Sequence, residues 1–190
     1  QIASACCKKA EALGMLIFSR AFSLSEMTFM TELNCVALHY CDLIKELTGV
    51  TPVISYSKAG NHKVRIDTKE ERKKILDFFG YTGKEISLSI NFANFENTDE
   101  EENCCYSAFV RGAFLICGNI TNPEKEYHLE FNISRIKLAA EFMTVLKEIN
   151  LNMKTLTRNS TQLIYCKESE TIEDCLGKIG ATKSFFFLME

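Results

Sequence analysis

The sequence predicts an α+β fold made of two αββαββα repeats, related by a pseudo-two-fold axis and joined into a saddle around a pair of central helices. Two observations support this prediction. The chain matches itself when it is shifted by 98 residues, the separation of the cysteine doublets Cys6-Cys7 and Cys104-Cys105. Within each half, apolar residues recur at helical spacing, then in alternation, and then in both patterns again, which indicates the same helices and strands twice.

The internal repeat extends beyond the doublets through the opening helix and the hairpin after it. A short length difference is then placed in the next helix, after which the segment from Leu43 matches the segment from Val145 and Gly80 matches Gly180. The chain is accordingly divided into a first repeat (1–80), a linker (81–103) and a second repeat (104–190). The identities without a gap are Cys6/Cys104, Cys7/Cys105, Ala10/Ala108, Gly14/Gly112, Glu26/Glu124, Glu32/Glu130 and Asn34/Asn132.

Each repeat is expected to contain the same elements in the same order. The predicted helices are 6–20, 34–47 and 68–79 in the first repeat, and 104–117, 134–149 and 169–179 in the second. The predicted hairpins are 22–33 and 120–133, followed by strands at 52–57, 63–66, 153–157 and 162–166.

Two connections carry local signals of their own. The second hairpin should turn at Asn122-Pro123, because this dipeptide is a strong turn signal. The linker ends in the acidic run 99–102, which is interpreted as a solvated segment whose Asp99 could cap the helix that follows.

Composition and charge narrow the class of protein. The 190 residues are 46% hydrophobic, which is enough to bury a sizeable core. Lys and Arg number 22 against 25 Asp and Glu, so the net charge of −3 gives no global attraction for nucleic acid. No segment is long and apolar enough to span a membrane, and no cleavable signal peptide opens the chain. A soluble cytoplasmic protein is expected, and any nucleic-acid contact must come from a local patch.

The nine cysteines form an odd set that does not indicate a disulfide scaffold. They are interpreted as reduced, mostly buried thiols. The doublets Cys6-Cys7 and Cys104-Cys105 could together form a four-thiolate zinc site, but zinc-binding pairs normally have two to four residues between their ligands. The sequence therefore predicts neither a metal nor a cofactor.

Two glycines occupy equivalent positions in the middle of the opening helices. Glycine inside a helix costs about 1 kcal/mol relative to alanine, so Gly14 and Gly112 need a compensating reason. Ala10 lies one turn before Gly14 on the same helix face, and Ala108 lies one turn before Gly112. Such strips of small residues let two helix backbones approach closely. The predicted helix-pair interface therefore contains Ala10, Gly14, Ala108 and Gly112.

The segment Phe109–Ile120 resembles the LAGLIDADG helix of homing endonucleases and the start of the following strand, and Leu13–Arg20 is a weaker match. The second cysteine doublet, this helix and the stretch Asn122–Phe131 are similar to the hallmark region of WhiA-type regulators. The resemblance spans nearly the whole chain. It implies a nucleoid-associated regulator of transcription in sporulation and cell division, with a helix-turn-helix domain beyond residue 190.

The resemblance also implies the partners. DNA would be bound mainly through the helix-turn-helix domain, another transcription protein is a further candidate partner, and no membrane is involved. The domain itself would then assist DNA binding or contact a protein.

The resemblance implies that nucleases of this fold have an acidic residue at the penultimate position of the motif. This residue holds a divalent cation beside the scissile phosphate. That position is Cys117 in the second repeat and Ser19 or Arg20 in the first, depending on the register. None of these is a carboxylate, and thiol, hydroxyl and guanidinium groups bind magnesium poorly. A non-catalytic module is expected, and the alternative is a divergent endonuclease or maturase with displaced acidic residues.

Strand alternation predicts which side chains would face DNA if the sheets lie along it. Lys63 and Arg65 should project from the sheet opposite buried neighbours. Glu32 and Glu130 are expected at symmetric positions on the same surface, where they would repel phosphates and leave at most a weak contact. The candidate nucleic-acid-binding residues are Lys58, Lys63, Arg65, Lys154 and Arg158.

Overall fold

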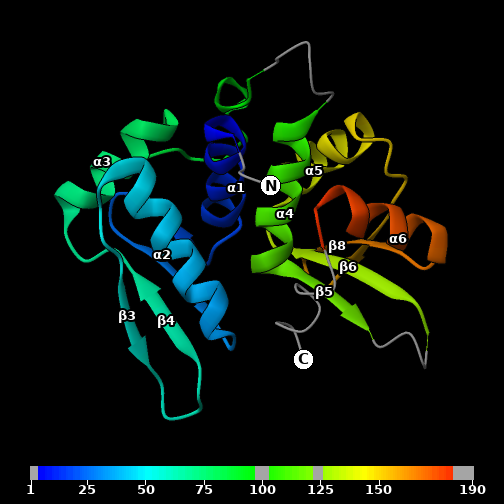
Figure 1. Ribbon diagram of the computed structural model, residues 1–190, viewed down its shortest axis with the longest axis horizontal. Helices are drawn as coiled ribbons and strands as arrows, with labels where there is room; N and C mark the ends of the chain where they lie inside the picture. Colours follow the sequence, from blue (N-terminus) through cyan, green and yellow to red (C-terminus); the bar gives the residue numbers. More distant parts are fainter. Residues whose placement is uncertain (1–3, 97–102, 122–125, 182–190) are drawn as a thin grey trace.

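Two similar halves, each with one antiparallel sheet and three helices, make up the computed structural model, which describes residues 4–96, 103–121 and 126–181 (Figure 1). The first half contains α1 (Ala5–Ile17), β1 (Ala21–Phe22), β2 (Met27–Thr31), α2 (Asn34–Thr48), β3 (Val53–Tyr56), β4 (His62–Arg65) and α3 (Lys69–Phe79). The second contains α4 (Cys104–Cys117), β5 (Gly118–Thr121), β6 (His128–Ile133), α5 (Ile136–Glu148), β7 (Lys154–Arg158), β8 (Thr161–Cys166) and α6 (Ser169–Lys178). The predicted fold class and element order are confirmed.

The strand order is the same in both sheets. It runs β1-β2-β4-β3 in the first and β5-β6-β8-β7 in the second, and all neighbouring strands are antiparallel. At equivalent places in the two sheets, Phe29 pairs with Val64 and Phe131 pairs with Ile164. All four side chains are buried, so each sheet packs one face against the core.

Helices α1 and α4 lie side by side between the two sheets (Figure 1). The whole segment of α1 from residue 10 to residue 17 is buried, as expected for a helix at the centre of a domain. Just past the end of α1, the ring of Phe18 packs on Phe109 and Phe142 of the second half, with centroids 5.8 and 5.2 Å away. The two halves therefore share one hydrophobic core.

The ends of α3 show how local signals fix an element. The Thr68 side chain accepts a hydrogen bond from the Glu71 N–H, and Gly80 ends the helix with φ 77° in the left-handed region. A threonine cap and a glycine stop are the expected boundary residues. The sequence prediction of 68–79 agrees with the observed helix.

The length difference between the halves lies in the hairpin, not in the helix after it. Gly14 and Gly112 are 98 residues apart, but α2 and α5 begin 102 residues apart. The pairing of Asn34 with Asn132 is therefore wrong, because Asn34 begins α2 while Asn132 lies within β6.

The matched pair Glu32/Glu130 is wrong for the same reason. Glu32 follows β2, whereas Glu130 lies inside β6. Since Phe131 is equivalent to Phe29, the counterpart of Glu130 in the first sheet is Thr28. The expected symmetric pair of acidic residues on the sheet surface does not form. Asn122-Pro123, Glu124 and the acidic run 99–102 lie outside the described residues.

The described part of the linker packs against the body of the protein. Tyr81, Ile90 and Phe95 are buried, and a 3-10 helix, η1 (Phe92–Asn94), lies against α1. The Tyr81 hydroxyl donates to the Ser89 carbonyl at 2.7 Å, which holds the segment in a compact turn. Across the ranges that the structure describes, no helix is long and apolar enough to cross a membrane.

Candidate functional site

The contact between α1 and α4 is a contact of backbones. A Cβ atom on Gly14 would overlap the Phe109 carbonyl oxygen and lie 3.0 Å from the Ala113 nitrogen. A Cβ atom on Gly112 would overlap the Glu11 carbonyl and lie 3.0 Å from the Met15 nitrogen. The two sets of neighbours are again 98 residues apart, so the contact follows the pseudo-two-fold. Ala10 and Ala108, one turn before the glycines, are fully buried.

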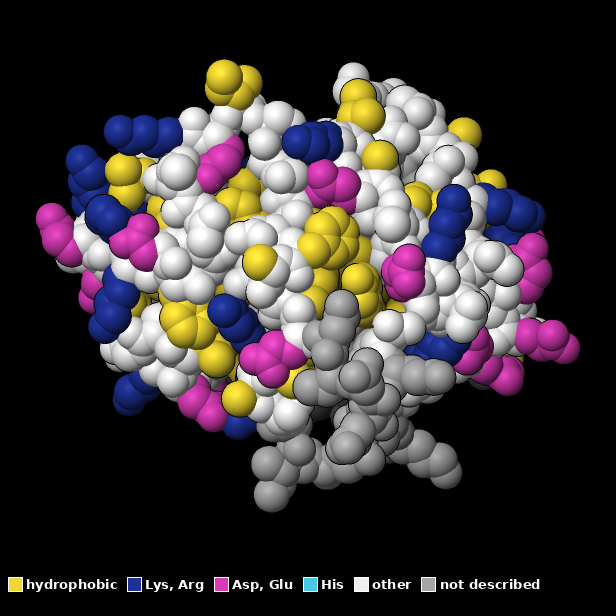
Figure 2. All heavy atoms as spheres, turned by 90° about the horizontal axis from the view of Figure 1, so that it is seen from above, with side chains coloured by type: hydrophobic (Ala, Val, Ile, Leu, Met, Phe, Trp, Pro, Cys, Tyr) yellow, Lys and Arg dark blue, Asp and Glu magenta, His cyan; other side chains and the backbone are white. Residues whose placement is uncertain are grey.

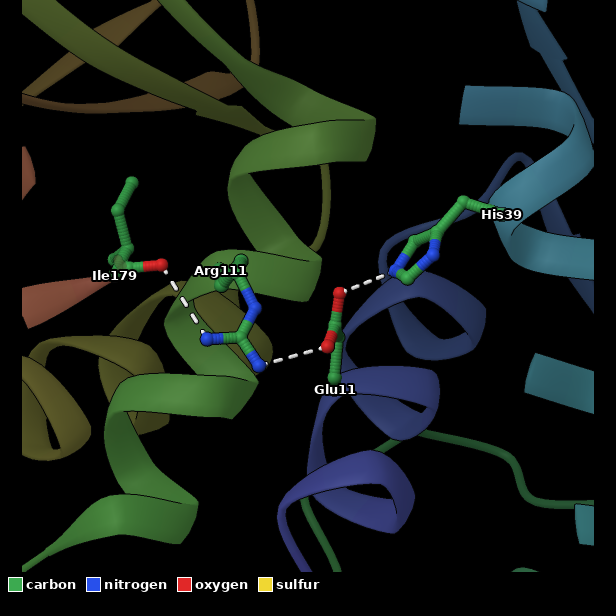
Figure 3. A network of polar contacts seen from close by, with 4 residues as sticks. All are labelled: Glu11, His39, Arg111 and Ile179. Carbon is green, nitrogen blue, oxygen red and sulfur yellow. Dashed lines mark hydrogen bonds and ion pairs between the residues drawn. The ribbon is translucent and has the colours of Figure 1, made fainter. Parts of the chain in front are cut away.

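A buried carboxylate joins the two halves beside these glycines (Figure 3). Glu11 is 4% exposed; its Oε1 lies 2.6 Å from His39 Nε2, and its Oε2 accepts from Arg111 Nη2 at 2.8 Å. Arg111 Nη1 also donates to the Ile179 carbonyl at 3.3 Å. Burial acts to raise the pKa of Glu11, but the hydrogen bonds from His39 and Arg111 outweigh it and hold this pKa below its ordinary value of 4.5. Four separate segments are therefore connected by one charged network.

The side chains at the helix ends, where nucleases of this fold would carry acids, bond to their own helices. The Ser19 hydroxyl donates to the Met15 and Leu16 carbonyls at 2.7 and 2.8 Å. The Cys117 thiol donates to the Ala113 carbonyl at 3.2 Å, and burial raises the pKa of Cys117 to about 12. Ser19 and Cys117 thus play the same structural part in the two repeats, and a protonated thiol is a poor metal ligand.

Arg20 lies outside the helix, since α1 ends at Ile17 rather than at residue 20 as predicted from the sequence. It lines an open cleft of about 870 Å³, together with Arg135 and Lys137. Arg135 also donates to the Ile17 carbonyl at 3.1 Å, so it closes the end of α1. Arg20 therefore points to a different environment from that of Ser19 and Cys117.

The outer face of the first sheet carries basic residues that are partly neutralised. Lys63 and Arg65 alternate with buried Val64, as predicted. Arg65 Nε lies 2.6 Å from Asp67 Oδ1, and its Nη1 donates to the Ser55 hydroxyl at 3.0 Å. Lys58 lies in the connection from β3 to β4.

The outer face of the second sheet is similar in character. Glu130 Oε2 lies 2.7 Å from His128 Nε2, and the His128 ring stacks on Tyr165 with centroids 5.8 Å apart. Lys154 Nζ lies 3.3 Å from Glu168 Oε1, while Arg158 ends β7 in an exposed position. Of the candidate basic residues, Arg65 and Lys154 are thus paired with carboxylates that lie just beyond the strands.

Metal-ligating side chains gather elsewhere. Among the described residues, only one group of three or more Cys, His, Asp or Glu side chains has ligand atoms close enough to share a metal ion, and it consists of Cys6, Cys7, Cys104 and Cys105. These cysteines begin α1 and α4, at the ends opposite Ser19 and Cys117. Within the described ranges, no group of three or more such side chains lies at the ends of α1 and α4 that carry Ser19 and Cys117.

Comparison with known proteins assigns the family. Residues 106–189 match the family described as the WhiA LAGLIDADG-like domain. The chain contains a WhiA-type LAGLIDADG domain. A curated relative from Ruminiclostridium cellulolyticum, named "Probable cell division protein WhiA", is 31% identical over 186 residues, covering 93% of this chain and 58% of the relative. The chain spans about half the length of the curated relatives that it matches over most of its own length.

Solved structures share the fold of this WhiA-type domain. The N-terminal LAGLIDADG domain of DUF199/WhiA aligns with a TM-score of 0.68 at 19% identity, covering 98% of this chain and 89% of that one. The homing endonuclease I-DmoI, solved in complex with DNA and Mn, aligns with a TM-score of 0.63 at 13% identity, covering 94% of this chain and 99% of the other. The WhiA domain and the endonuclease therefore have one architecture.

Sequence reasoning missed one feature of the WhiA-type domain and rejected another, the grouping of the two cysteine doublets, because of the spacing of the cysteines. The sequence contained one indication of the network of Glu11, His39 and Arg111. This indication is the glutamate itself, which lies among apolar residues of the first helix. The approach of the two cysteine doublets had a clearer signal, because their separation equals that of Gly14 and Gly112. Helices paired at the glycines also bring their first turns together.

Proposed function

We propose that this domain is a non-catalytic part of a DNA-binding transcription regulator that acts in cell division and sporulation. In this proposal the domain supports DNA binding or contacts a protein partner, while the strong DNA site lies in a helix-turn-helix domain elsewhere in the protein. The observation that carries the proposal is the use of Ser19 and Cys117 to hold the ends of their own helices. Such residues leave no carboxylate at the two positions where the nuclease mechanism needs one.

The chemistry of phosphodiester cleavage supports the same conclusion. Metal-dependent nucleases use carboxylates to hold cations that stabilise the attacking and leaving oxygens. A hydroxyl and a protonated thiol that both donate to carbonyls cannot replace these ligands for magnesium or manganese.

We predict no metal-dependent nuclease activity. The purified domain, incubated with supercoiled and linear DNA in magnesium or manganese, should leave both substrates intact, while an active endonuclease of the same fold cleaves its target in parallel. Cleavage that disappears in Glu85→Gln would contradict the assignment, because Glu85 is a carboxylate in the cleft beside Arg20. That result would favour a divergent endonuclease with displaced acids.

The charge distribution supports a weak role in DNA binding. Non-specific affinity depends on the number of phosphates that a protein neutralises. The net charge is −3, Arg65 is held by Asp67, and Lys154 is held by Glu168. Two of the five candidate basic residues are therefore already paired with carboxylates, which lowers the number of counterions of DNA that the sheets can replace.

We expect this chain to bind duplex DNA with a dissociation constant of about 10⁻⁴ M or weaker at physiological salt, the weak end of non-specific binding. Titration of a fluorescent duplex at two salt concentrations measures both the affinity and its salt dependence. The double variant Lys63→Ala/Arg65→Ala should change the affinity no more than Lys74→Ala/Lys147→Ala, which removes the same charge from two exposed helix positions.

A full-length WhiA relative should bind the same duplex more tightly, because the proposal places the strong site outside this domain. Tight, steeply salt-dependent binding by the present chain, lost only in Lys63→Ala/Arg65→Ala, would show instead that the first sheet is a main DNA surface.

A further inference from the structure

The first turns of α1 and α4 place four thiols together. Cys6 and Cys7 are the second and third residues of α1, and Cys104 and Cys105 are the first two of α4. All four Sγ atoms lie within 4.8 Å of one another. The two helices come from different repeats and touch at Gly14 and Gly112, so the same pseudo-symmetric contact holds the doublets in place.

We propose that these four cysteines bind one zinc ion, which clamps the two repeats together at the start of the paired helices. The site is distinct from the helix ends at Ser19 and Cys117, and it does not depend on the function proposed above. Binding would convert four thiols and one zinc ion into a tetrathiolate complex and release four protons.

The sulfur positions fit a single tetrahedral ion. With Zn–S bonds of about 2.3 Å, the sulfurs of such a site lie about 3.8 Å apart. Thiols within 4.8 Å of one another need to move inward by only about 1 Å to reach this geometry. An iron–sulfur cluster distributes its four thiolates over two or four iron atoms and holds at least some of them farther apart, so the compact group favours one ion.

Helix geometry explains why doublets can serve here in place of the usual spaced pairs. Adjacent residues of a helix point about 100° apart, so the sulfurs of one doublet can approach an ion from two sides. The second helix then supplies the other two ligands.

The surroundings suit a structural site. Cys105 is buried, and Cys6, Cys7 and Cys104 are partly buried. Figure 2 views the molecule from above, at the end where α1 and α4 begin, and shows hydrophobic side chains, the class that includes cysteine, gathered in the middle with charged side chains around them. Four soft thiolates select zinc over hard cations such as magnesium.

The direct test is the metal content of the whole chain, purified under reducing conditions with added zinc. Elemental analysis should find about one zinc per chain, the count that four thiolate ligands imply. Cobalt, used as a probe in place of zinc, should give the absorption bands of a tetrahedral thiolate complex. Zinc should also protect the four thiols from alkylation, as read by mass spectrometry.

Variants separate this site from the other cysteines. Cys6→Ser and Cys105→Ser should lose the bound zinc and the cobalt spectrum, while Cys41→Ser, a partly buried cysteine outside the group, should keep both. A zinc chelator should lower the melting temperature of the wild-type chain by on the order of 10 °C and leave that of Cys6→Ser unchanged. The circular dichroism of each variant shows whether it has folded.

Three results would overturn the proposal. One is the absence of bound zinc, with all four thiols freely alkylated in the folded wild-type chain. Another is a pair of disulfides between the doublets in protein purified under reducing conditions. The third is iron with acid-labile sulfide in anaerobically purified protein, which would assign the cysteines to a cluster.

Discussion

Replacing Gly112 with alanine is expected to destabilise the domain by about 3 kcal/mol or more, at or above the upper end of the usual range for overpacking. The new Cβ would overlap the Glu11 carbonyl oxygen, and the Met15 nitrogen lies only 3.0 Å away. Both obstacles are backbone atoms of α1, so no side-chain rotation can relieve the clash. The helices would have to separate along their whole contact. Urea unfolding followed by circular dichroism measures the loss.

A matched control comes from a glycine in open surroundings. Gly177 lies in α6, and an added Cβ there would meet no atom within 4 Å. Gly177→Ala should therefore be neutral or stabilise the domain by up to about 1 kcal/mol, since alanine is the better helix former. Gly14→Ala should behave like Gly112→Ala, because its Cβ overlaps the Phe109 carbonyl. Equal stabilities for the variants at positions 112 and 177 would refute the close helix contact.

Changing Glu11 to glutamine is expected to cost about 1.5 to 3 kcal/mol at neutral pH, the range for hydrogen bonds to charged groups. The substitution keeps the volume but removes the charge that both Arg111 and His39 contact. The control is Glu46→Gln, which breaks the more exposed pair with Lys8 at 2.6 Å. That change should cost no more than about 0.5 kcal/mol.

The effect of Glu11→Gln should also depend on pH in a defined direction. The pKa of Glu11 is held below 4.5, so its carboxylate favours the folded state at pH values above 4.5. This contribution is lost as the pH falls through the lowered pKa. The difference in unfolding free energy between wild type and Glu11→Gln should be constant near neutral pH and shrink below pH 4.5. A difference that persists throughout the acid range would show that the charge of Glu11 is not the cause.

Much of the fold could be predicted from the sequence because its signals are local or repeated. The threonine and glycine at the ends of α3 act within one turn, and the alternation around Val64 needs only the strand itself. The pairing of α1 with α4 is a long-range contact, yet equivalent glycines in the two repeats revealed it. Repetition thus supplied the tertiary information that one unit alone would lack.

The errors arose where the two repeats differ. The sequence comparison kept the 98-residue shift of Gly14 and Gly112 through the hairpin. The second hairpin has more residues before its helix, so the shift is larger there. The sequence predicts that α1 continues to Arg20 because the apolar spacing continues through Phe18. In the structure, the Ser19 hydroxyl instead donates hydrogen bonds to carbonyls of the last turn. The spacing of apolar residues gives no information about such side-chain hydrogen bonds.

The candidate site was less predictable than the fold, because it depends on which side chains meet across the repeats. Glu11 could be read as a helix residue, but neither Arg111 nor His39 is near it in sequence. The usual sequence spacing of two zinc ligands in one segment likewise does not describe a site to which two helices each supply two adjacent cysteines. For Arg111 and for the cysteines, this information lies in the contact between the two halves.

The charged network of Glu11 and Arg111 also determines which repeat can pair with which. In the internal register, Arg111 corresponds to Leu13 and Glu11 corresponds to Phe109. If the first repeats of two chains packed on each other, each Glu11 would face a leucine in place of Arg111, and only His39 would remain as a partner of its buried carboxylate. Two second repeats would place Arg111 against Phe109. This one asymmetric pair therefore disfavours the homodimer that a symmetric helix contact would otherwise permit, and it selects pairing of unlike repeats.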